Sequence, residues 1–264
     1  TVTFVRRGLV DHSDSLGASA RYGNGDVQWM TAGAGIVHAE MFPLLNHDES
    51  NTGELFQIWL NLPAADKFAA PHFSMLWSED VPIVRLADRS GRTVEITIAA
   101  GEFGEDRPPA PPPASWASKP EADVAIWRIA MDAYAEWTLP ASVGPDTLRV
   151  LYVFEGEGVM IDGQSMSNRS GVLLRGPRQV VLANGTTPSC ILMLQGRPIG
   201  EPVVQYGPFV MNDRAGIERA FDDYRRTGFG GWPWPVDDPV HGYEGRFARH
   251  ADGRVERPAG QTAH

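Results

Sequence analysis

Cysteine is almost absent from this chain of 264 residues, because Cys190 is the only one. A single cysteine excludes an intrachain disulfide and favours a reducing compartment, so we expect a cytoplasmic protein. The sequence also lacks a run of about 18 apolar residues, the length that a membrane-spanning helix requires. Residues 1–5 have neither the basic nor the apolar region of a secretory signal peptide. We therefore expect no membrane partner.

Basic residues are scarce as well: there are 23 lysines and arginines against 33 aspartates and glutamates, and the formal net charge is −10. This balance does not favour the continuous basic surface that binds phosphate backbones, so we expect no direct nucleic-acid partner. Lys67 and Lys119 are the only lysines. We attribute the preference for arginine to the codon usage of a GC-rich genome rather than to arginine chemistry.

Glycine and proline are frequent, with 28 and 21 copies, which indicates many turns and short elements rather than long helices. Segments rich in β-branched and aromatic residues, bounded by turn signals, fill both halves of the chain and predict short strands. The clearest are residues 1–5, 27–30, 55–60, 92–99, 124–129, 148–154, 159–161, 172–174, 179–183 and 190–194. Many short strands at this spacing predict an all-β sandwich or barrel.

A proline-rich segment interrupts this pattern, because six prolines lie between residues 104 and 120 and cannot pair as a central strand. We therefore predict an N-terminal domain over residues 1–103, a linker over 104–120, a C-terminal domain over 121–211, and a helix with an extended tail over 212–264. The helix is expected from Asp213 to Arg226, with Asn212 as its cap and Gly228 as its end. Two tryptophans of the tail, Trp232 and Trp234, are expected to lie on the β structure.

Histidine is missing from the predicted C-terminal domain: four of the seven histidines precede the proline-rich segment and three follow in the tail. A metal site built on imidazole therefore fits the N-terminal domain. We expect the C-terminal domain to hold no metal and to have an apolar interior. Residues expected in that interior are Leu151, Val153, Val159 and Leu192.

The pair His38 and Glu40 is the strongest candidate for a metal site. Residues i and i+2 of a strand point to the same face, so both side chains would share one side of the sheet. Imidazole and carboxylate together form half of a site for a first-row metal such as Fe(II). The alternative is that His38 is a hydrogen-bonded core histidine and Glu40 is solvated. His12, His47 and His72 lie in polar or proline-flanked stretches and are expected on the surface.

Residues 25–41, GDVQWMTAGAGIVHAEM, resemble the signature of the pirins, a family of bicupins. Residues 11–17 (DHSDSLG), 57–63 (QIWLNLP) and 201–212 (EPVVQYGPFVMN) are similar to further pirin segments. The resemblance implies two cupin-type β-barrels with one iron, Fe(II), in the N-terminal barrel, held by three histidines and a glutamate. His38 and Glu40 match the last two ligands.

The other two ligands implied by the resemblance belong to a His-x-His motif just upstream of the strand that residues 1–5 match. This sequence begins after that motif, so we expect an N-terminally incomplete chain that lacks two ligands. The small-residue stretch at 33–35 lacks the strand–helix context of a dinucleotide loop and is interpreted as a turn.

The resemblance implies two kinds of function. The first is a quercetin 2,3-dioxygenase-like enzyme that opens a flavonol or similar aromatic ring, with Glu40 as metal ligand and as base. Trp29, Met30 and Phe56 would then line the substrate pocket, although they fit an ordinary barrel core equally well. The alternative is a redox-sensitive metal-binding regulator that acts through a protein partner. A metal-free structural bicupin is a third possibility.

Overall fold

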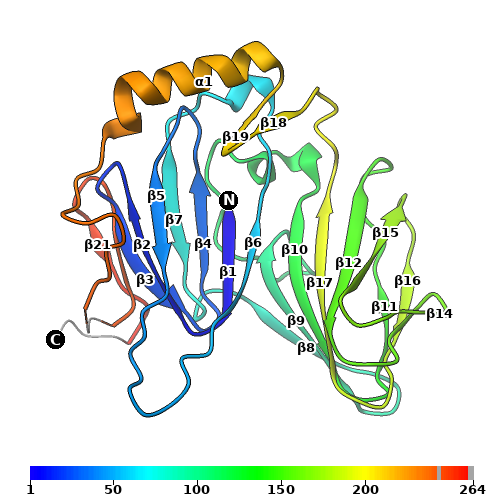
Figure 1. The fold of residues 1–264 in the computed structure, drawn as a ribbon. Helices are drawn as coiled ribbons and strands as arrows, with labels where there is room; N and C mark the ends of the chain where they lie inside the picture. The colour runs from blue at the N-terminus through cyan, green and yellow to red at the C-terminus, as the bar shows by residue number, and fades with distance from the viewer. Residues whose placement is uncertain (243–244, 261–264) are drawn as a thin grey trace. The chain divides into compact units, whose positions relative to one another are not determined.

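The computed structural model describes residues 1–242 and 245–260, and it confirms an all-β chain with one short α-helix near the C-terminus (Figure 1). The chain folds into two compact units. Unit 1 comprises Thr1–Asp80, Pro111–Trp116 and Gly200–His264, and unit 2 comprises Val81–Ala110 and Ala117–Ile199. The part of the predicted tail at residues 243–244 and 261–264 lies outside the described residues.

Unit 1 is built on two antiparallel sheets. The four-stranded sheet has the order β6-β1-β4-β7, and its strands are β1 (Val2–Arg7), β4 (Val27–Thr31), β6 (Glu54–Ile58) and β7 (His72–Leu76). The five-stranded sheet has the order β21-β20-β3-β2-β5, and its strands are β2 (Leu9–Asp14), β3 (Ser19–Gly23), β5 (His38–Met41), β20 (Phe247–Arg249) and β21 (Val255–Glu256). Side chains from both sheets form one buried cluster that includes Val5, Val10, Tyr22, Phe73 and Ala248.

A hairpin and a helix complete unit 1. The hairpin consists of β18 (Val204–Tyr206) and β19 (Phe209–Met211), and it leads directly into α1 (Arg214–Thr227), which lies across one end of the strands of this unit (Figure 1). The short 3₁₀ helices of this unit are η1 (Ala64–Asp66) and η4 (Gly228–Gly230).

The position of α1 matches the prediction to within one residue, but its cap differs. The backbone N–H of Gly216 donates to Oδ1 of Asp213 at 2.6 Å, so Asp213 is the N-cap. Asn212, the expected cap, instead donates from its side chain to Oε2 of Glu201 at 2.9 Å. Gly228, at a φ of 56°, ends the helix as expected, because glycine adopts this left-handed conformation without steric cost.

The described part of the tail does more than lie on the β structure, because it adds strands to a sheet of unit 1. Two of its segments become strands, and β20 pairs with β3. Trp234 donates from Nε1 to the backbone oxygen of Asp14 at 2.8 Å, so this tryptophan holds the tail to β2. Trp232 instead donates to the oxygen of Val236 within the tail itself.

Unit 2 also consists of two antiparallel sheets. Its six-stranded sheet has the order β15-β12-β17-β10-β9-β8, with β8 (Ile83–Ala87), β9 (Thr93–Ala100), β10 (Ala125–Met131), β12 (Leu148–Glu155), β15 (Ser170–Arg175) and β17 (Ser189–Gly196). Its four-stranded sheet has the order β11-β16-β13-β14, with β11 (Glu136–Leu139), β13 (Met160–Ile161), β14 (Gln164–Ser165) and β16 (Val180–Ala183). The 3₁₀ helices η2 (Trp116–Ser118) and η3 (Pro120–Ala122) lie before β10.

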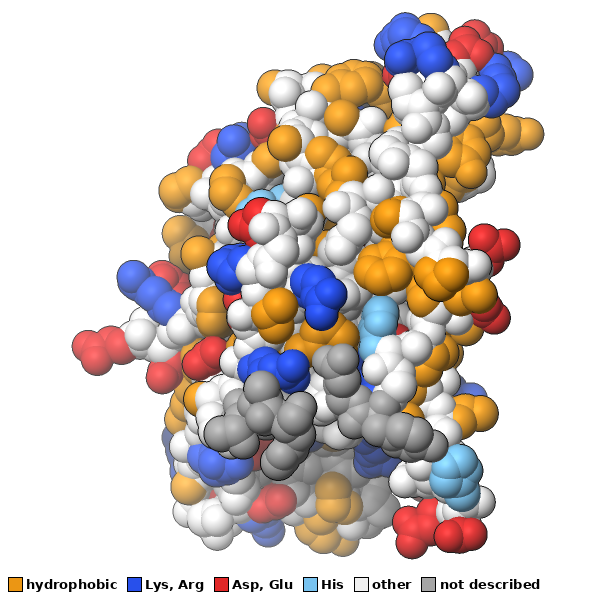
Figure 2. Space-filling view, turned by 90° about the vertical axis from the view of Figure 1, so that its left-hand side faces the viewer, with side chains coloured by type: hydrophobic (Ala, Val, Ile, Leu, Met, Phe, Trp, Pro, Cys, Tyr) orange, Lys and Arg blue, Asp and Glu red, His pale blue; other side chains and the backbone are white. Residues whose placement is uncertain are grey.

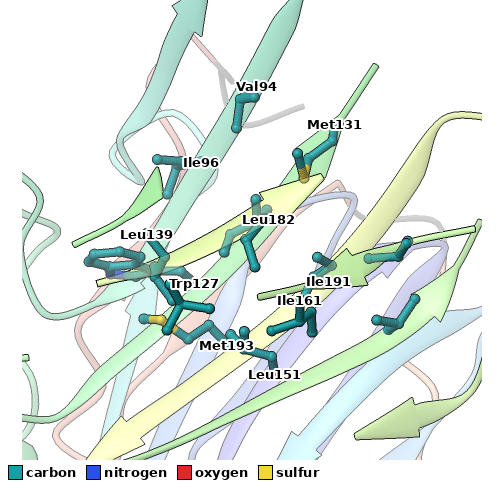
Figure 3. Close-up of a cluster of buried hydrophobic side chains, with 14 of the residues drawn as sticks. Val94, Ile96, Trp127, Met131, Leu139, Leu151, Ile161, Leu182, Ile191 and Met193 are labelled. Carbon is teal, nitrogen blue, oxygen red and sulfur yellow. The ribbon is translucent and has the colours of Figure 1, made fainter. Parts of the chain in front are cut away.

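The interior of unit 2 is apolar, and Figure 3 shows side chains from both sheets converging there. Leu151, Val153 and Val159 belong to this core, as expected. Leu192 is buried but lies outside the cluster. Its neighbours Ile191 and Met193 are in the core, and strand alternation turns the residue between them to the other face of the sheet.

The boundaries of the units differ from the expected domain ranges. Residues 81–103, expected in the N-terminal domain, belong to unit 2 because β9 pairs with β10 along six residue pairs and β8 pairs with β9. The expected linker, 104–120, is divided between the units, and residues 200–211 belong to unit 1 rather than to the C-terminal domain. Proline density marks where strands are interrupted, whereas strand pairing decides which unit a segment joins.

No helix in the described part of the chain is both long and apolar enough to cross a membrane. On the face drawn in Figure 2, the basic side chains are interspersed with acidic and apolar ones.

Candidate metal site and adjoining cavity

Three potential metal ligands meet where β2 pairs with β5. The antiparallel register sets His12 opposite Glu40 and Asp14 opposite His38. One ligand atom from each of His12, His38 and Glu40 lies within 4.8 Å of the other two. His12 is fully buried, whereas His38 and Glu40 are half-buried. The alternation that places His38 and Glu40 on one face also places His12 there, through its cross-strand partner.

The prediction that His12 lies on the surface is therefore wrong. Polar neighbours in the sequence favoured an exposed position, but here they are buried as well: Asp11, Ser13 and Asp14 are at most 1% exposed. His47 and His72 are exposed, as expected.

Two ring nitrogens at this site have no hydrogen-bond partner within residues 1–242 and 245–260. They are Nδ1 of His12 and Nδ1 of His38, and both are buried. A buried polar atom without a partner costs about 1–3 kcal/mol, which a bound cation would offset. Two imidazoles and a carboxylate are a donor set that suits first-row divalent metals, including Fe(II). The residues present thus fit a metal ion.

The carboxylate of Glu40 is held by three donors. Gln57 donates from Nε2 to Oε2 at 2.7 Å, Thr3 donates to Oε1 at 3.1 Å, and the hydroxyl of Tyr22 donates to Oε1 at 3.4 Å. Burial, followed by the charge of Glu40, raises the pKa of Tyr22 well above its usual value. Tyr22 therefore stays protonated and remains a donor to the carboxylate, which fixes the direction of its oxygens.

The two histidines are held by different contacts. The ring of His12 stacks on Phe73 with centroids 5.2 Å apart, and its Nε2 lies 3.2 Å from Oδ2 of Asp14. The rings of His12 and His38 are 5.6 Å apart. Burial, followed by the neighbouring His12, lowers the pKa of His38 from its ordinary value of 6.5. His38 is therefore neutral at pH 7, and a neutral imidazole keeps a lone pair for a metal.

A cavity of about 820 Å³ adjoins the site within unit 1, and His38 forms part of its wall. Trp29 and Met30, two of the predicted pocket residues, line it. Phe56 is not among the lining residues; it lies on β6 opposite Phe4 of β1. The volume and the largely apolar lining are typical of a site for a small organic molecule.

Comparison with known proteins identifies the chain. A family model described as pirin matches residues 1–60, and a model described as the pirin C-terminal cupin domain matches residues 126–230. A pirin-like protein from Caulobacter vibrioides is 37% identical over 231 residues, covering 87% of this chain and 76% of that protein. The chain belongs to the pirin family. Its resemblance to the pirins, read from residues 25–41, is thereby confirmed.

Relatives of this pirin include proteins named for an enzymatic activity. A Pseudomonas aeruginosa protein, named as a candidate quercetin 2,3-dioxygenase, is 35% identical and covers 87% of this chain and 75% of its own. The crystal structure of a quercetin 2,3-dioxygenase from Acinetobacter baumannii matches with a TM-score of 0.72 at 29% identity, covering 87% of this chain and 75% of that one. The two units of this pirin are accordingly of the cupin type.

Much of the cavity wall of this pirin comes from residues that the sequence analysis did not assign to the site. The hairpin, the residue before it, α1 and η4 contribute Val203, Gln205, Pro208, Phe209, Val210, Met211, Ala220, Phe221, Asp223, Tyr224 and Phe229. Phe221 and Phe209 meet edge to face with centroids 4.8 Å apart. Two signals were available. Residues 201–212 resemble a pirin segment, and α1 has an apolar stripe, but neither shows what these residues cover.

The loop between β4 and β5 of this pirin requires glycine at two positions. Gly33 and Gly35 have φ values of 51° and 129°, which favour glycine. A Cβ at Gly33 would clash with the backbone oxygen of Ala69, and one at Gly35 would clash with the ring of Phe229. The loop can therefore pass close to Phe229 before it reaches His38, which agrees with the interpretation of these residues as a turn.

Proposed function

We propose that this pirin is a metal-dependent dioxygenase of the quercetin 2,3-dioxygenase type, which opens the ring of a flavonol or a similar aromatic molecule. The observation that supports this most directly is that His38 belongs both to the group of potential metal ligands and to the wall of the cavity. A substrate in the cavity would thus lie beside the metal. The names of the Pseudomonas and Acinetobacter proteins point to the same activity.

We propose Fe(II) as the metal, held by His38 and Glu40 as the family resemblance implies, with His12 as a third ligand and the second nitrogen donor in this chain. The ion, when bound, supplies the Lewis-acid and redox chemistry that a reaction of O₂ with an organic ring requires. His38 and Glu40 come from one short strand, so their separation is fixed by strand geometry.

The protein's own groups have two further tasks in this proposal. Glu40 accepts the proton of a substrate hydroxyl, and its hydrogen bonds from Thr3, Tyr22 and Gln57 keep its oxygens in a fixed direction while it does so. The aromatic walls, including Trp29 and Phe221, exclude water and fit a flat ring system.

The test is the loss of flavonol absorbance when the iron-loaded protein is mixed with quercetin and O₂. Glu40→Gln removes the base and one ligand, so we expect the rate to fall by at least about two orders of magnitude. His72→Ala is the matched control, because His72 is exposed on β7, and this variant should keep the wild-type rate. Absence of flavonol cleavage by the iron-loaded wild-type protein, or full activity of Glu40→Gln, would overturn the proposal.

A further inference from the structure

Lys67 is a buried cation in the wall of the cavity. It directly follows η1, and only 7% of its surface is exposed. Its Nζ donates one hydrogen bond, to Oδ1 of Asn61 at 2.5 Å. Both residues line the cavity, in the same unit as His38.

The charge of Lys67 is incompletely compensated. An ammonium group has three donors, and within the described ranges 1–242 and 245–260 Nζ has neither a second acceptor nor an ion pair. Glu201 attracts it electrostatically, but Oε2 of Glu201 already accepts from the backbone N–H of Ala64 at 2.7 Å and from Asn212 at 2.9 Å. The acidic residue of the cavity wall, Asp223, accepts from Arg226 at 2.6 Å.

Burying an ammonium group with one neutral acceptor costs free energy, and a ligand that brings an anionic oxygen would recover it. The rest of the lining is dominated by aromatic and aliphatic side chains such as Trp29, Phe68 and Phe221. In an apolar pocket a single charged group determines the orientation of the ligand, and therefore the class of ligand that binds. A purely structural lysine that only fixes Asn61 would not discriminate between ligands.

We propose that Lys67 makes this cavity selective for aromatic molecules with an anionic oxygen, such as an ionised polyphenol or an aromatic carboxylate. The proposal rests on the proposed function in one respect: it specifies which aromatic substrates the dioxygenase site would accept. Flat neutral aromatics would enter the cavity and bind more weakly, because they leave the ammonium group with the neutral Asn61 oxygen as its acceptor and without an anionic partner.

The experiment uses two fluorescent probes that differ by one sulfonate: 8-anilinonaphthalene-1-sulfonate and the neutral N-phenyl-1-naphthylamine. Each is titrated into the metal-free protein under air. We expect one sulfonate probe per chain, bound at least about tenfold more tightly than the neutral probe, which is the size of one hydrogen bond to a charged group. Lys67→Met should weaken the sulfonate probe by about 10- to 100-fold and leave the neutral probe unchanged.

Two variants serve as matched controls. Lys119→Met removes the other lysine of the chain, which lies in unit 2, and should keep the wild-type preference. Lys67→Arg keeps the charge and should retain most of the preference for the sulfonate probe. Near-ultraviolet circular dichroism verifies that each variant is folded.

If Lys67→Met does not fold, displacement of the sulfonate probe from wild-type protein by 2-naphthoate and by 2-naphthamide gives the answer, with naphthoate expected to be at least about tenfold more effective. Equal affinity for charged and neutral ligands in wild-type protein, an unchanged preference in Lys67→Met, or no binding of either probe would overturn the proposal. Because neither probe requires iron or turnover, this result is independent of whether the protein cleaves flavonols.

Discussion

The two units place antiparallel sheets around very different interiors. In unit 2 the space between the sheets is filled by aliphatic side chains such as Leu151, Ile191 and Met193 (Figure 3). In unit 1 one end of the corresponding space contains His12, which is fully buried together with charged neighbours. The one arginine buried in the described part of unit 2, Arg149, donates to the backbone oxygens of Pro140 and Arg178, whereas unit 1 buries a histidine and carboxylates that need stabilising contacts from other side chains.

Strand β2 supplies many of those contacts, because it is polar and buried on both faces. His12 faces the candidate metal site, whereas Asp11, its neighbour, forms a two-pronged ion pair with Arg21, with both N–O distances at 2.7 Å. The tail covers this side: the backbone N–H of His241 donates to Asp11 at 2.8 Å. The ion pair between Asp11 and Arg21 thus fixes β2 on the face opposite His12.

The largest effect is expected from removing a metal ligand. His38→Ala should lower the affinity for Fe(II) by at least about two orders of magnitude, because it removes one of the two imidazole ligands of the candidate site. Elemental analysis after dialysis against ferrous iron measures this. His47→Ala, an exposed histidine of the same unit, should retain wild-type iron content. Tight iron binding by His38→Ala would mean that the buried histidines are packing residues after all.

Extending the chain upstream sharpens the same comparison. A variant that carries a His-x-His motif ahead of residue 1, as the family resemblance implies, should retain iron stoichiometrically at concentrations at which residues 1–264 lose it. Equal affinity of the two proteins would show that His12, His38 and Glu40 suffice for the site.

The next largest effect concerns the ion pair between Asp11 and Arg21. Arg21→Met leaves Asp11 buried without its partner, so we expect a loss of about 3–5 kcal/mol in the free energy of unfolding. The double variant Asp11→Leu/Arg21→Met removes both charges and should recover much of that loss. Urea denaturation measures the three proteins. A loss below about 1 kcal/mol in Arg21→Met would indicate that water reaches Asp11.

A smaller loss is expected from the apolar core of unit 2. Leu151→Ala creates a cavity in a fully buried position and should cost about 2–4 kcal/mol. Iron content should not change, because Leu151 lies in the unit that does not contain the candidate site. Urea denaturation and elemental analysis on the same preparation separate the two outcomes, and a loss of iron by a folded Leu151→Ala would show that the candidate site depends on the packing of unit 2.

The parts of the structure that could be predicted were those determined by neighbouring residues. The shared face of His38 and Glu40 follows from strand alternation, and the span of α1 follows from helical spacing and its terminal residues. His12 was missed because its position depends on the register between β2 and β5, which pairs it with Glu40, 28 residues later in the sequence, and leaves no local signal. The predicted domain boundaries differ from those of the units for the same reason, since the pairing of β9 with β10 places residues 93–100 in unit 2.

The contact between Gly35 and Phe229 has a consequence for how this sequence can vary. Any side chain at position 35 would occupy the space of the Phe229 ring, and that ring belongs to a segment almost two hundred residues later. The φ of 129° at position 35 disfavours a side chain as well, so a smaller residue at 229 would not make one acceptable and would leave a void that glycine cannot fill. Position 35 is therefore expected to stay glycine among related sequences, and an aromatic ring at 229 is expected to accompany it.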